Sequence, residues 1–356
     1  MVMSIRLTQF SHGAGCGCKI SPALLGDILK NNIVYPTANV IVGNSDRDDA
    51  AAYLIDNDQV LLSTTDFFMP VVDDARDFGR IAAANAISDI YAMGGRPILA
   101  LAILGWPVDK LPAELANAVV AGAREVAAES GITIAGGHSI DSQEPIFGLA
   151  VNGLVSARQL KRNSTAEPGD LLVLTKPLGI GIHTTAMKKS LLKSEHEGIA
   201  VKEMTMLNKI GRDLAEIPEV HALTDVTGFG LGGHLIEMVT PRNLIAEIDF
   251  ARLPQLPGLA DYIAAGAVPG GTQRNFKSFG DKISGIEDKL AQNGVEGLRR
   301  AIVCDPQTSG GLLIAVSPKA YDSLVSVFEK KGMRDRLHAI GRIAKEPGRS
   351  AQVNVN

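Results

Sequence analysis

Residues 78–104 read FGRIAAANAISDIYAMGGRPILALAIL, and this stretch decides the fold class. Helix-forming residues run from Phe78 to Met93, where the pair Gly94-Gly95 ends the expected helix. An apolar run from Ile98 to Leu104 follows and is typical of a buried β-strand. Three carboxylates that suit the positive end of a helix dipole precede the helix: Asp73, Asp74 and Asp77. This succession of helix and strand indicates an α/β protein.

Further strands and helices alternate on both sides of this stretch. The first unit is expected to hold a helix over Leu111–Glu129 and strands over Ala51–Ile55, Gln59–Ser63, Ile132–Ala135 and Ile146–Val155. The second is expected to hold strands over Leu171–Thr175, Val220–Leu223, Ile245–Ile248, Ala301–Val303, Leu312–Ala315 and His338–Ile343. Because the polar stretch Arg158–Gly169 separates the units, the sequence predicts α/β domains at residues 49–157 and 158–356. Residues 1–48 are expected to form a glycine-rich arm that stays mobile until something orders it.

Composition excludes several classes of protein. The 356 residues include 35 Lys+Arg against 39 Asp+Glu, a net charge of −4, and only 4% are aromatic. Such a chain lacks the basic surface and the stacking platforms of a nucleic-acid binder. Its longest apolar run, Ile98 to Trp106, is far shorter than the roughly 20 residues that span a bilayer. We therefore expect a cytoplasmic protein that binds neither nucleic acid nor membrane.

Four aspartates interrupt or flank apolar segments: Asp49, Asp66, Asp89 and Asp225. A buried carboxylate is costly unless it is solvated, hydrogen-bonded or facing a cation. Several carboxylates that meet at strand ends would form a hard-oxygen site for Mg²⁺ bound to the phosphates of a nucleotide. Taken singly, each could instead be a turn, helix-face or capping residue, and that interpretation stays open. Asn85 lies four residues before Asp89, so the two share a helix face lined by alanines.

Glycine-rich turns offer further polar groups for phosphate binding. Gly136-Gly137-His138-Ser139 follows an expected strand, and two similar segments occupy residues 225–231 and 305–311. Each segment alone could be an ordinary tight turn. The sequence contains no Walker A motif and no complete dinucleotide fingerprint, and its histidines show no metal-ligand spacing.

The segment Cys16-Gly17-Cys18-Lys19 carries the most distinctive chemistry of the arm. A nearby ammonium favours the thiolate, so the pattern fits a reactive thiol, although a lone C-x-C pair is also compatible with no special role. Cys304 follows the apolar run Ala301–Val303 and is expected to be a small buried residue.

Nine segments taken together closely resemble the selenophosphate synthetases, also called selenide, water dikinases. They are residues 11–19, 47–50, 63–68, 85–95, 104–107, 135–141, 144–151, 224–231 and 305–313. The resemblance implies a reaction in which ATP, selenide and water give selenophosphate, AMP and phosphate. It also implies a need for Mg²⁺, activation by K⁺, and a homodimer. The fold it implies is that of aminoimidazole ribonucleotide synthetase, in which strands of the first domain form a barrel shared by the two subunits.

The same resemblance assigns roles to single residues. It implies that Cys16 is the essential thiol and that Lys19 meets the nucleotide phosphates. It implies that Asp49, Asp89 and Asp225 hold Mg²⁺. The remaining implied ATP contacts are Asp46, Arg47, Asp48, Asp66 and Asp89, together with Gly137, His138 and Ser139 reaching over from the partner subunit. A separate protein that delivers selenium is a further implied partner.

Two other functions remain open on the sequence alone. The first is a different ATP-using enzyme of the same fold, which would release ADP in place of AMP. The second is a non-enzymatic metal- or selenium-binding protein that uses Cys16 and Cys18 as a soft site. This second reading gives the aspartates no role.

Overall fold

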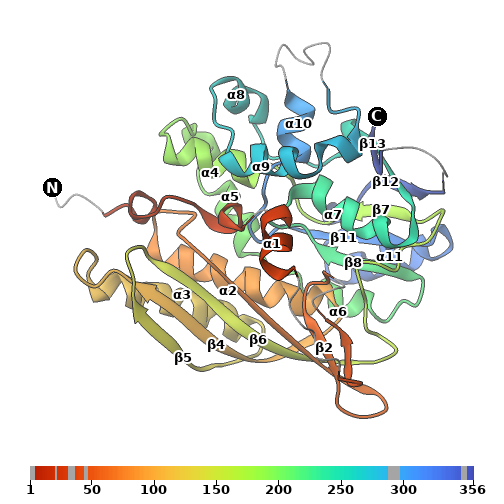
Figure 1. Cartoon of the computed structure of the whole chain (residues 1–356), viewed down its shortest axis with the longest axis horizontal. Helices are drawn as coiled ribbons and strands as arrows, with labels where there is room; N and C mark the ends of the chain where they lie inside the picture. The colour runs from red at the N-terminus through yellow and green to blue at the C-terminus, as the bar shows by residue number, and fades with distance from the viewer. Residues whose placement is uncertain (1–4, 21, 31–36, 44–46, 288–296, 346–350) are drawn as a thin grey trace.

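The first domain is a six-stranded sheet with helices on one face. We describe it from a computed structural model, which covers residues 5–20, 22–30, 37–43, 47–287, 297–345 and 351–356. The strands follow the order β1-β2-β3-β6-β4-β5, and β4 and β5 form the parallel pair. Their bounds are β1 Val40–Val42, β2 Ala51–Leu54, β3 Gln59–Phe68, β4 Arg96–Trp106, β5 Ile134–Asp141 and β6 Ile146–Ser156. Helices α2 (Ala75–Ala92) and α3 (Ala113–Glu129) cover one face of this sheet (Figure 1).

The second domain has a seven-stranded mixed sheet in the order β10-β13-β9-β12-β7-β11-β8. Its strands are β7 Leu171–Leu174, β8 Val220–Asp225, β9 Ile245–Ile248, β10 Ile283–Ser284, β11 Leu312–Val316, β12 His338–Ala344 and β13 Val353–Val355. Its helices are α4 Ile180–Lys188, α5 Ile199–Thr205, α6 Ile210–Leu214, α7 Gly230–Val239, α8 Leu259–Ala264, α9 Gly270–Phe279, α10 Leu298–Val303 and α11 Tyr321–Lys330. Helix α2 of the first domain contacts α5, α6 and β8, so it joins the two domains.

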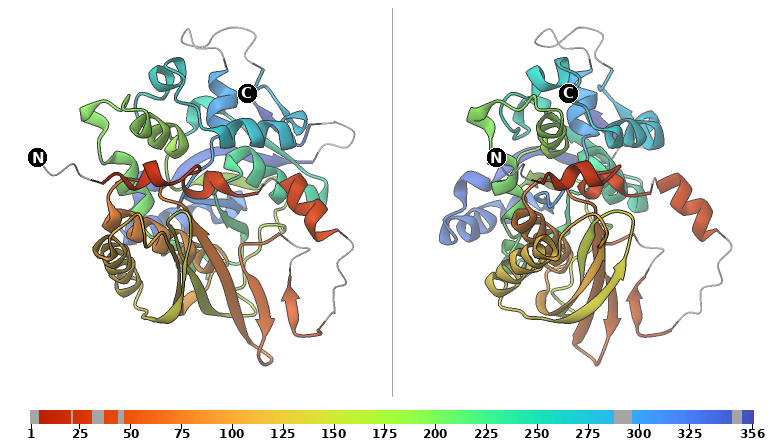
Figure 2. Two further views of the ribbon diagram at one scale, coloured as in Figure 1. Left: turned by 60° about the vertical axis from the view of Figure 1, so that its left-hand side comes forward. Right: turned by 90° about the vertical axis from the view of Figure 1, so that its left-hand side faces the viewer.

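The N-terminal arm lies between the two domains (Figure 2). It contains two 3₁₀ turns, η1 (Leu7–Phe10) and η2 (Gly15–Cys18), and helix α1 (Pro22–Leu29). Polar contacts from both domains hold the arm in place: Arg6 Nε to Asp73 Oδ2 at 2.7 Å, His12 Nδ1 to Glu144 Oε2 at 2.8 Å, and Lys188 Nζ to the Ser11 carbonyl at 3.2 Å. Residues 6–12 of the arm are therefore joined to both domains by polar contacts.

Most of the expected elements are present, but two segments differ from the expected type of structure. Residues Ala301–Val303, expected as a strand, end helix α10, because three apolar residues suit either structure and here pack as part of a helical turn. Gly136–Ser139, expected as a turn after a strand, lies inside β5, whose residues pair in parallel with β4. No helix within the described ranges has both the length and the apolarity needed to cross a membrane.

Two glycines allow α2 and α3 to pack closely. A Cβ atom on Gly79 would lie 1.8 Å from the Val119 carbonyl oxygen, and one on Gly122 would lie 2.0 Å from that of Arg76. Both distances are far below van der Waals contact with rigid backbone, so neither helix can accept a larger residue without moving.

Gly122→Ala is expected to destabilise the protein. Relieving the contact requires α3 to move from α2, which costs on the order of 1–3 kcal/mol by the usual scale of overpacking. Urea unfolding measures the loss, and Asn117→Ala on the exposed side of the same helix is the control, since alanine there only raises helix propensity. Equal stability of Gly122→Ala and the wild type would contradict this account of the packing.

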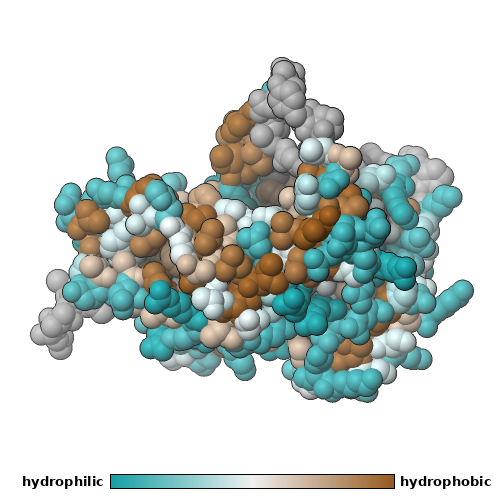
Figure 3. Space-filling view, turned by 90° about the horizontal axis from the view of Figure 1, so that it is seen from below, coloured by the Kyte–Doolittle hydropathy of each residue, from teal (hydrophilic) through white to brown (hydrophobic). Residues whose placement is uncertain are grey.

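The face of the first sheet opposite α2 and α3 exposes apolar side chains. Phe67 is 50% exposed, Leu101 is 40% exposed and Leu99 is 36% exposed, and all three point to the same side of the sheet. Figure 3 shows a broad band of hydrophobic residues on the underside of the molecule. A contiguous apolar patch of this kind is characteristic of a protein–protein interface.

Candidate active site

Three carboxylates from different parts of the fold meet at the junction of the two domains. Asp49 precedes β2, Asp89 lies near the end of α2 and Asp225 ends β8. One carboxylate oxygen from each lies within 4.8 Å of the other two. The oxygen Asp49 Oδ2 is buried and has no hydrogen-bond partner among the described residues. Three converging carboxylates, one of which has an unpartnered oxygen, fit the ligand preference of Mg²⁺.

The electrostatics of this acidic cluster are unfavourable without a cation. Burial and the charge of Asp225 raise the pKa values of both Asp49 and Asp89 well above the usual range. Burial also raises the pKa of Asp225, to about 6, although a hydrogen bond from Ser88 and the nearby Lys19 ammonium oppose the rise. Three buried carboxylates therefore repel one another, and a divalent cation between them would remove that repulsion.

Hydroxyl groups hold each member of the cluster. Thr64 Oγ1 donates to Asp89 Oδ2 at 2.6 Å, and Thr224 Oγ1 donates to Asp49 Oδ1 at 2.8 Å. Ser88 Oγ donates to Asp225 Oδ2. These three hydroxyls were not identified from the sequence, because serine and threonine within regular elements carry no signal of their own. Their role is to fix the carboxylate orientations.

Lys19 from the arm faces the acidic cluster. Its Nζ lies 3.3 Å from Asp66 Oδ2, and Asp66 also accepts a hydrogen bond from Asn85 Nδ2. Burial alone would lower the pKa of Lys19, but the neighbouring carboxylates, Asp66 above all, outweigh burial and raise it. The ammonium therefore stays charged, as a group that binds phosphate must.

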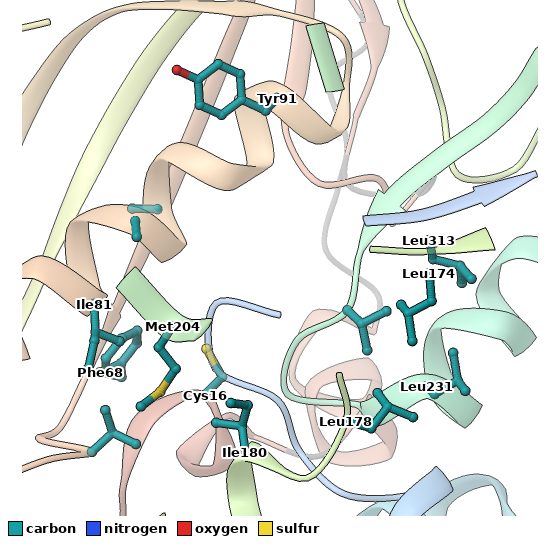
Figure 4. Packing of buried hydrophobic residues seen from close by; sticks show 14 of the residues in the cluster. Cys16, Phe68, Ile81, Tyr91, Leu174, Leu178, Ile180, Met204, Leu231 and Leu313 are labelled. Atoms are coloured by element: carbon teal, nitrogen blue, oxygen red, sulfur yellow. The ribbon is translucent and has the colours of Figure 1, made fainter. Parts of the chain in front are cut away.

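Cys16 is buried within the hydrophobic cluster that also contains Ile81, Ile180 and Met204 (Figure 4). Its Sγ donates to Asn85 Oδ1 at 3.2 Å, and its backbone N–H donates to Thr308 Oγ1 at 3.0 Å. Burial, reinforced by the charge of Asp66, raises the pKa of the Cys16 thiol well above its usual value despite the opposing effect of Lys19. Lys19 lowers the pKa of Cys16, as the sequence suggested, but burial outweighs that effect, so this conformation favours the protonated thiol.

Cys18 and Gly228 affect how the arm is folded and how closely it packs against the second domain. Cys18 Sγ donates to the Gly15 carbonyl oxygen at 2.7 Å, so its thiol is used within the arm itself. A Cβ atom on Gly228 would lie 2.5 Å from the Cys16 carbonyl oxygen, so only glycine lets the arm approach the second domain this closely. Cys304 is fully buried, as expected, and burial raises its pKa to about 12.

A cavity of about 300 Å³ opens above the acidic cluster. Its lining joins the arm, both domains and helix α7, and consists of Lys19, Leu25, Arg47, Asp48, Asp49, Thr64, Thr65, Asp66, Asp89, Asp225, Thr227, Phe229, His234 and Glu237. Asp48 is anchored by Asn163, whose backbone N–H donates to Oδ1 at 2.6 Å. The polar walls and the charged ammonium of Lys19 suit the binding of a polyanion, with a cation between the polyanion and the carboxylates.

Residues 47–155 match the model of the AIR synthase related protein, N-terminal domain, and residues 167–354 match that of its C-terminal domain. A selenide, water dikinase from Aeromonas hydrophila is 55% identical over 97% of both chains. One from Yersinia pseudotuberculosis is 54% identical over 99% of this chain and 98% of its own. The chain belongs to the selenide, water dikinase family. The resemblance seen in the sequence is therefore confirmed.

Solved structures show the same fold at low identity. A thiamine-monophosphate kinase from Stenotrophomonas maltophilia has a TM-score of 0.64, 20% identity, and 94% coverage of both chains. The hydrogenase maturation protein HypE, solved in complex with ATP, has a TM-score of 0.63 and 15% identity, covering 96% of this chain and 87% of its own. The expected two-domain α/β fold of the AIR synthase type is confirmed.

This member of the selenide, water dikinase family brings most of the expected site residues together. Those lining or adjoining the cavity are Cys16, Lys19, Arg47, Asp48, Asp49, Asp66, Asp89 and Asp225. Gly137, His138 and Ser139 do not line it and lie exposed on β5. Asp46 lies outside the described residues. The sequence analysis missed His234 and Glu237, whose spacing of three residues on α7 was the available signal.

Proposed function

We propose that the cavity binds ATP beside the acidic cluster and that the arm brings the Cys16 thiol to it for selenophosphate synthesis. The reaction is that of the family: ATP, selenide and water give selenophosphate, AMP and phosphate. The observation that carries the proposal is a continuous path of contacts. Asn85 contacts Cys16 Sγ through its oxygen and Asp66 through its nitrogen, and Asp66 in turn pairs with Lys19.

The residues of the acidic cluster fit Mg²⁺. Asp49, Asp89 and Asp225 would hold it, and when bound it would supply positive charge next to the nucleotide phosphates. Lys19 adds a second positive charge from the arm, so that a polyanion can enter a cavity lined by carboxylates. The family resemblance implies activation by K⁺, and we include that activation in the proposal.

The arm covers the site and can exclude water from it. Arg274 donates to the Gly17 carbonyl oxygen and Thr308 receives the Cys16 N–H, so contacts from the second domain hold the two ends of the thiol segment. Opening the arm would expose Cys16 to selenide, and closing it would shield the transferred phosphoryl group. Because burial keeps the thiol protonated in the closed form, we infer that Cys16 loses its proton while the arm is open.

A homodimer completes the proposal. The apolar face that includes Phe67, Leu99 and Leu101 supports an interface through the first sheet, where strands of two copies would form the shared barrel. Gly137, His138 and Ser139 lie exposed on β5 of that sheet, which leaves them accessible to the ATP of a partner subunit. A cytoplasmic setting and delivery of selenium by another protein are parts of the same proposal.

Anaerobic ³¹P NMR of the protein with ATP, Mg²⁺, K⁺ and selenide tests this function. We expect selenophosphate together with equal amounts of AMP and phosphate, and no selenophosphate in the control without selenide. ADP as the end product would instead indicate another ATP-using enzyme of the same fold. Binding of selenium without consumption of ATP would favour the non-enzymatic reading.

A further inference from the structure

Glu237 occupies a distinct position among the carboxylates of the active-site cavity. Each of five aspartates in the wall accepts at least one hydrogen bond from the protein: Asp48, Asp49, Asp66, Asp89 and Asp225. Glu237 accepts none from the residues that the structure describes, although its side chain is only 17% exposed. Among the described residues, no donor engages either of its oxygens, so both can accept from a water molecule in the cavity.

His234 lies one helical turn before Glu237 and faces it. The backbone N–H of Thr227 donates to His234 Nε2 at 3.0 Å, so the neutral ring carries its proton on Nδ1. That Nδ1 lies 3.6 Å from Glu237 Oε2, which is too long for a hydrogen bond, so the imidazole is a close polar neighbour that leaves the carboxylate oxygens unbonded. Burial lowers the pKa of His234 to about 3, so the ring stays neutral and cannot compete for a proton.

The surroundings of Glu237 suit a base at neutral pH. Burial raises its pKa to about 7, with Arg47 and Lys19 opposing the rise and Asp48 adding to it. A carboxylate with a pKa near the working pH combines a useful ionised fraction with real proton affinity.

We propose that Glu237 is the general base for the hydrolytic half of the reaction, in which water converts ADP to AMP and phosphate. This inference rests on the proposed function, which requires a second phosphoryl transfer to water after selenophosphate has formed. The water oxygen bonds to the β-phosphorus of ADP while one of its protons passes to the Glu237 carboxylate. The bond from the β-phosphorus to the bridging oxygen breaks, and its electron pair stays on AMP. Glu237 then releases the proton to solvent.

Glu237→Gln keeps the size of the side chain but removes its basicity. In a quenched time course with ATP, Mg²⁺, K⁺ and selenide, we expect selenophosphate at close to the wild-type rate in the first turnover. ADP should accumulate instead of AMP, because the rate of AMP formation should fall about 100-fold or more, which is the usual contribution of a general base. Glu114→Gln, on the exposed first turn of α3, is the matched control and should give AMP as the wild type does.

Two further measurements separate a base from a structural residue. Wild-type AMP formation should rise with pH through about 7 as Glu237 ionises, and the residual rate of Glu237→Gln should lack that limb. Glu237→Asp should recover part of the rate, while circular dichroism and melting confirm that the variants fold.

Clear outcomes would overturn the inference. A wild-type ratio of AMP to selenophosphate from Glu237→Gln would show that another group accepts the proton. Parallel loss of both products together with ATP binding would make Glu237 a binding residue.

Supplying ADP directly separates this inference from the proposed function. If the wild type makes no selenophosphate the proposed function fails, and the role of Glu237 is then decided by whether the wild type hydrolyses ADP and the variant does not.

Discussion

Cys16→Ser is expected to abolish selenide-dependent turnover while leaving ATP binding nearly unchanged. The serine hydroxyl can donate to Asn85 Oδ1 as the thiol does, so the arm keeps its place. It lacks the nucleophilicity of sulfur, and removal of a reacting nucleophile commonly costs at least about 1,000-fold in rate. ³¹P NMR measures selenophosphate formation, and an equilibrium titration with a fluorescent ATP analogue measures binding.

Cys18→Ser is the matched variant on the same arm. Since Cys18 Sγ donates to the Gly15 carbonyl oxygen, a bond that a hydroxyl can also form, we expect selenophosphate formation to persist. A wild-type yield of selenophosphate from Cys16→Ser would disprove the role of that thiol. Equal loss from both variants would instead favour a soft site built from both sulfurs.

Much of the fold could be predicted because its elements are regular and strongly patterned. Strand β9 has the expected bounds, Ile245–Ile248, and α2 spans nearly the expected residues. Strand β3 continues beyond the expected end at Ser63 to Phe68, because alternate side chains there face opposite sides of the sheet and polar residues can extend the strand. The run Ala301–Val303 was too short for its periodicity to separate helix from strand.

The site was predictable where charge itself was the signal. Asp49, Asp89 and Asp225 stood out as carboxylates beside apolar segments, and the structure brings them together. Burial of Cys16 could not be predicted, because it arises from contacts with both domains that no local pattern encodes. The sequence suggested that Lys19 would favour a thiolate, and Lys19 does lower the pKa of Cys16, but the opposing effects of burial and of Asp66 follow only from the fold.

Glu237 was missed for a different reason. The histidines were searched only for metal-ligand spacing, and His234 has none. What distinguishes Glu237 is that none of the described residues donates to it, while each of the five aspartates that line the cavity accepts a hydrogen bond. This difference arises from the three-dimensional fold and could not be predicted from the sequence.

Asp89→Asn is expected to separate stability from ligand binding. An asparagine keeps the shape of the side chain and can still accept from Thr64 Oγ1, but it removes one of three mutually repelling charges. We therefore expect the metal-free variant to melt at a higher temperature than the metal-free wild type, by a few degrees for a gain of about 1 kcal/mol. The same change replaces a charged carboxylate ligand with a weaker neutral amide oxygen, so binding of Mg·ATP should weaken by tenfold or more.

Melting with EDTA, with Mg²⁺, and with Mg²⁺ and ATP measures both effects on one protein. A ligand at 100 times its Kd stabilises the wild type by about 2.7 kcal/mol, and most of this gain should vanish in the variant. Asp322→Asn, an exposed change in the first turn of α11, controls for loss of charge and should respond like the wild type. If Asp89→Asn lowered metal-free stability yet kept the full response to Mg·ATP, Asp89 would be a structural acceptor for Thr64 and the cation would have to bind through other oxygens.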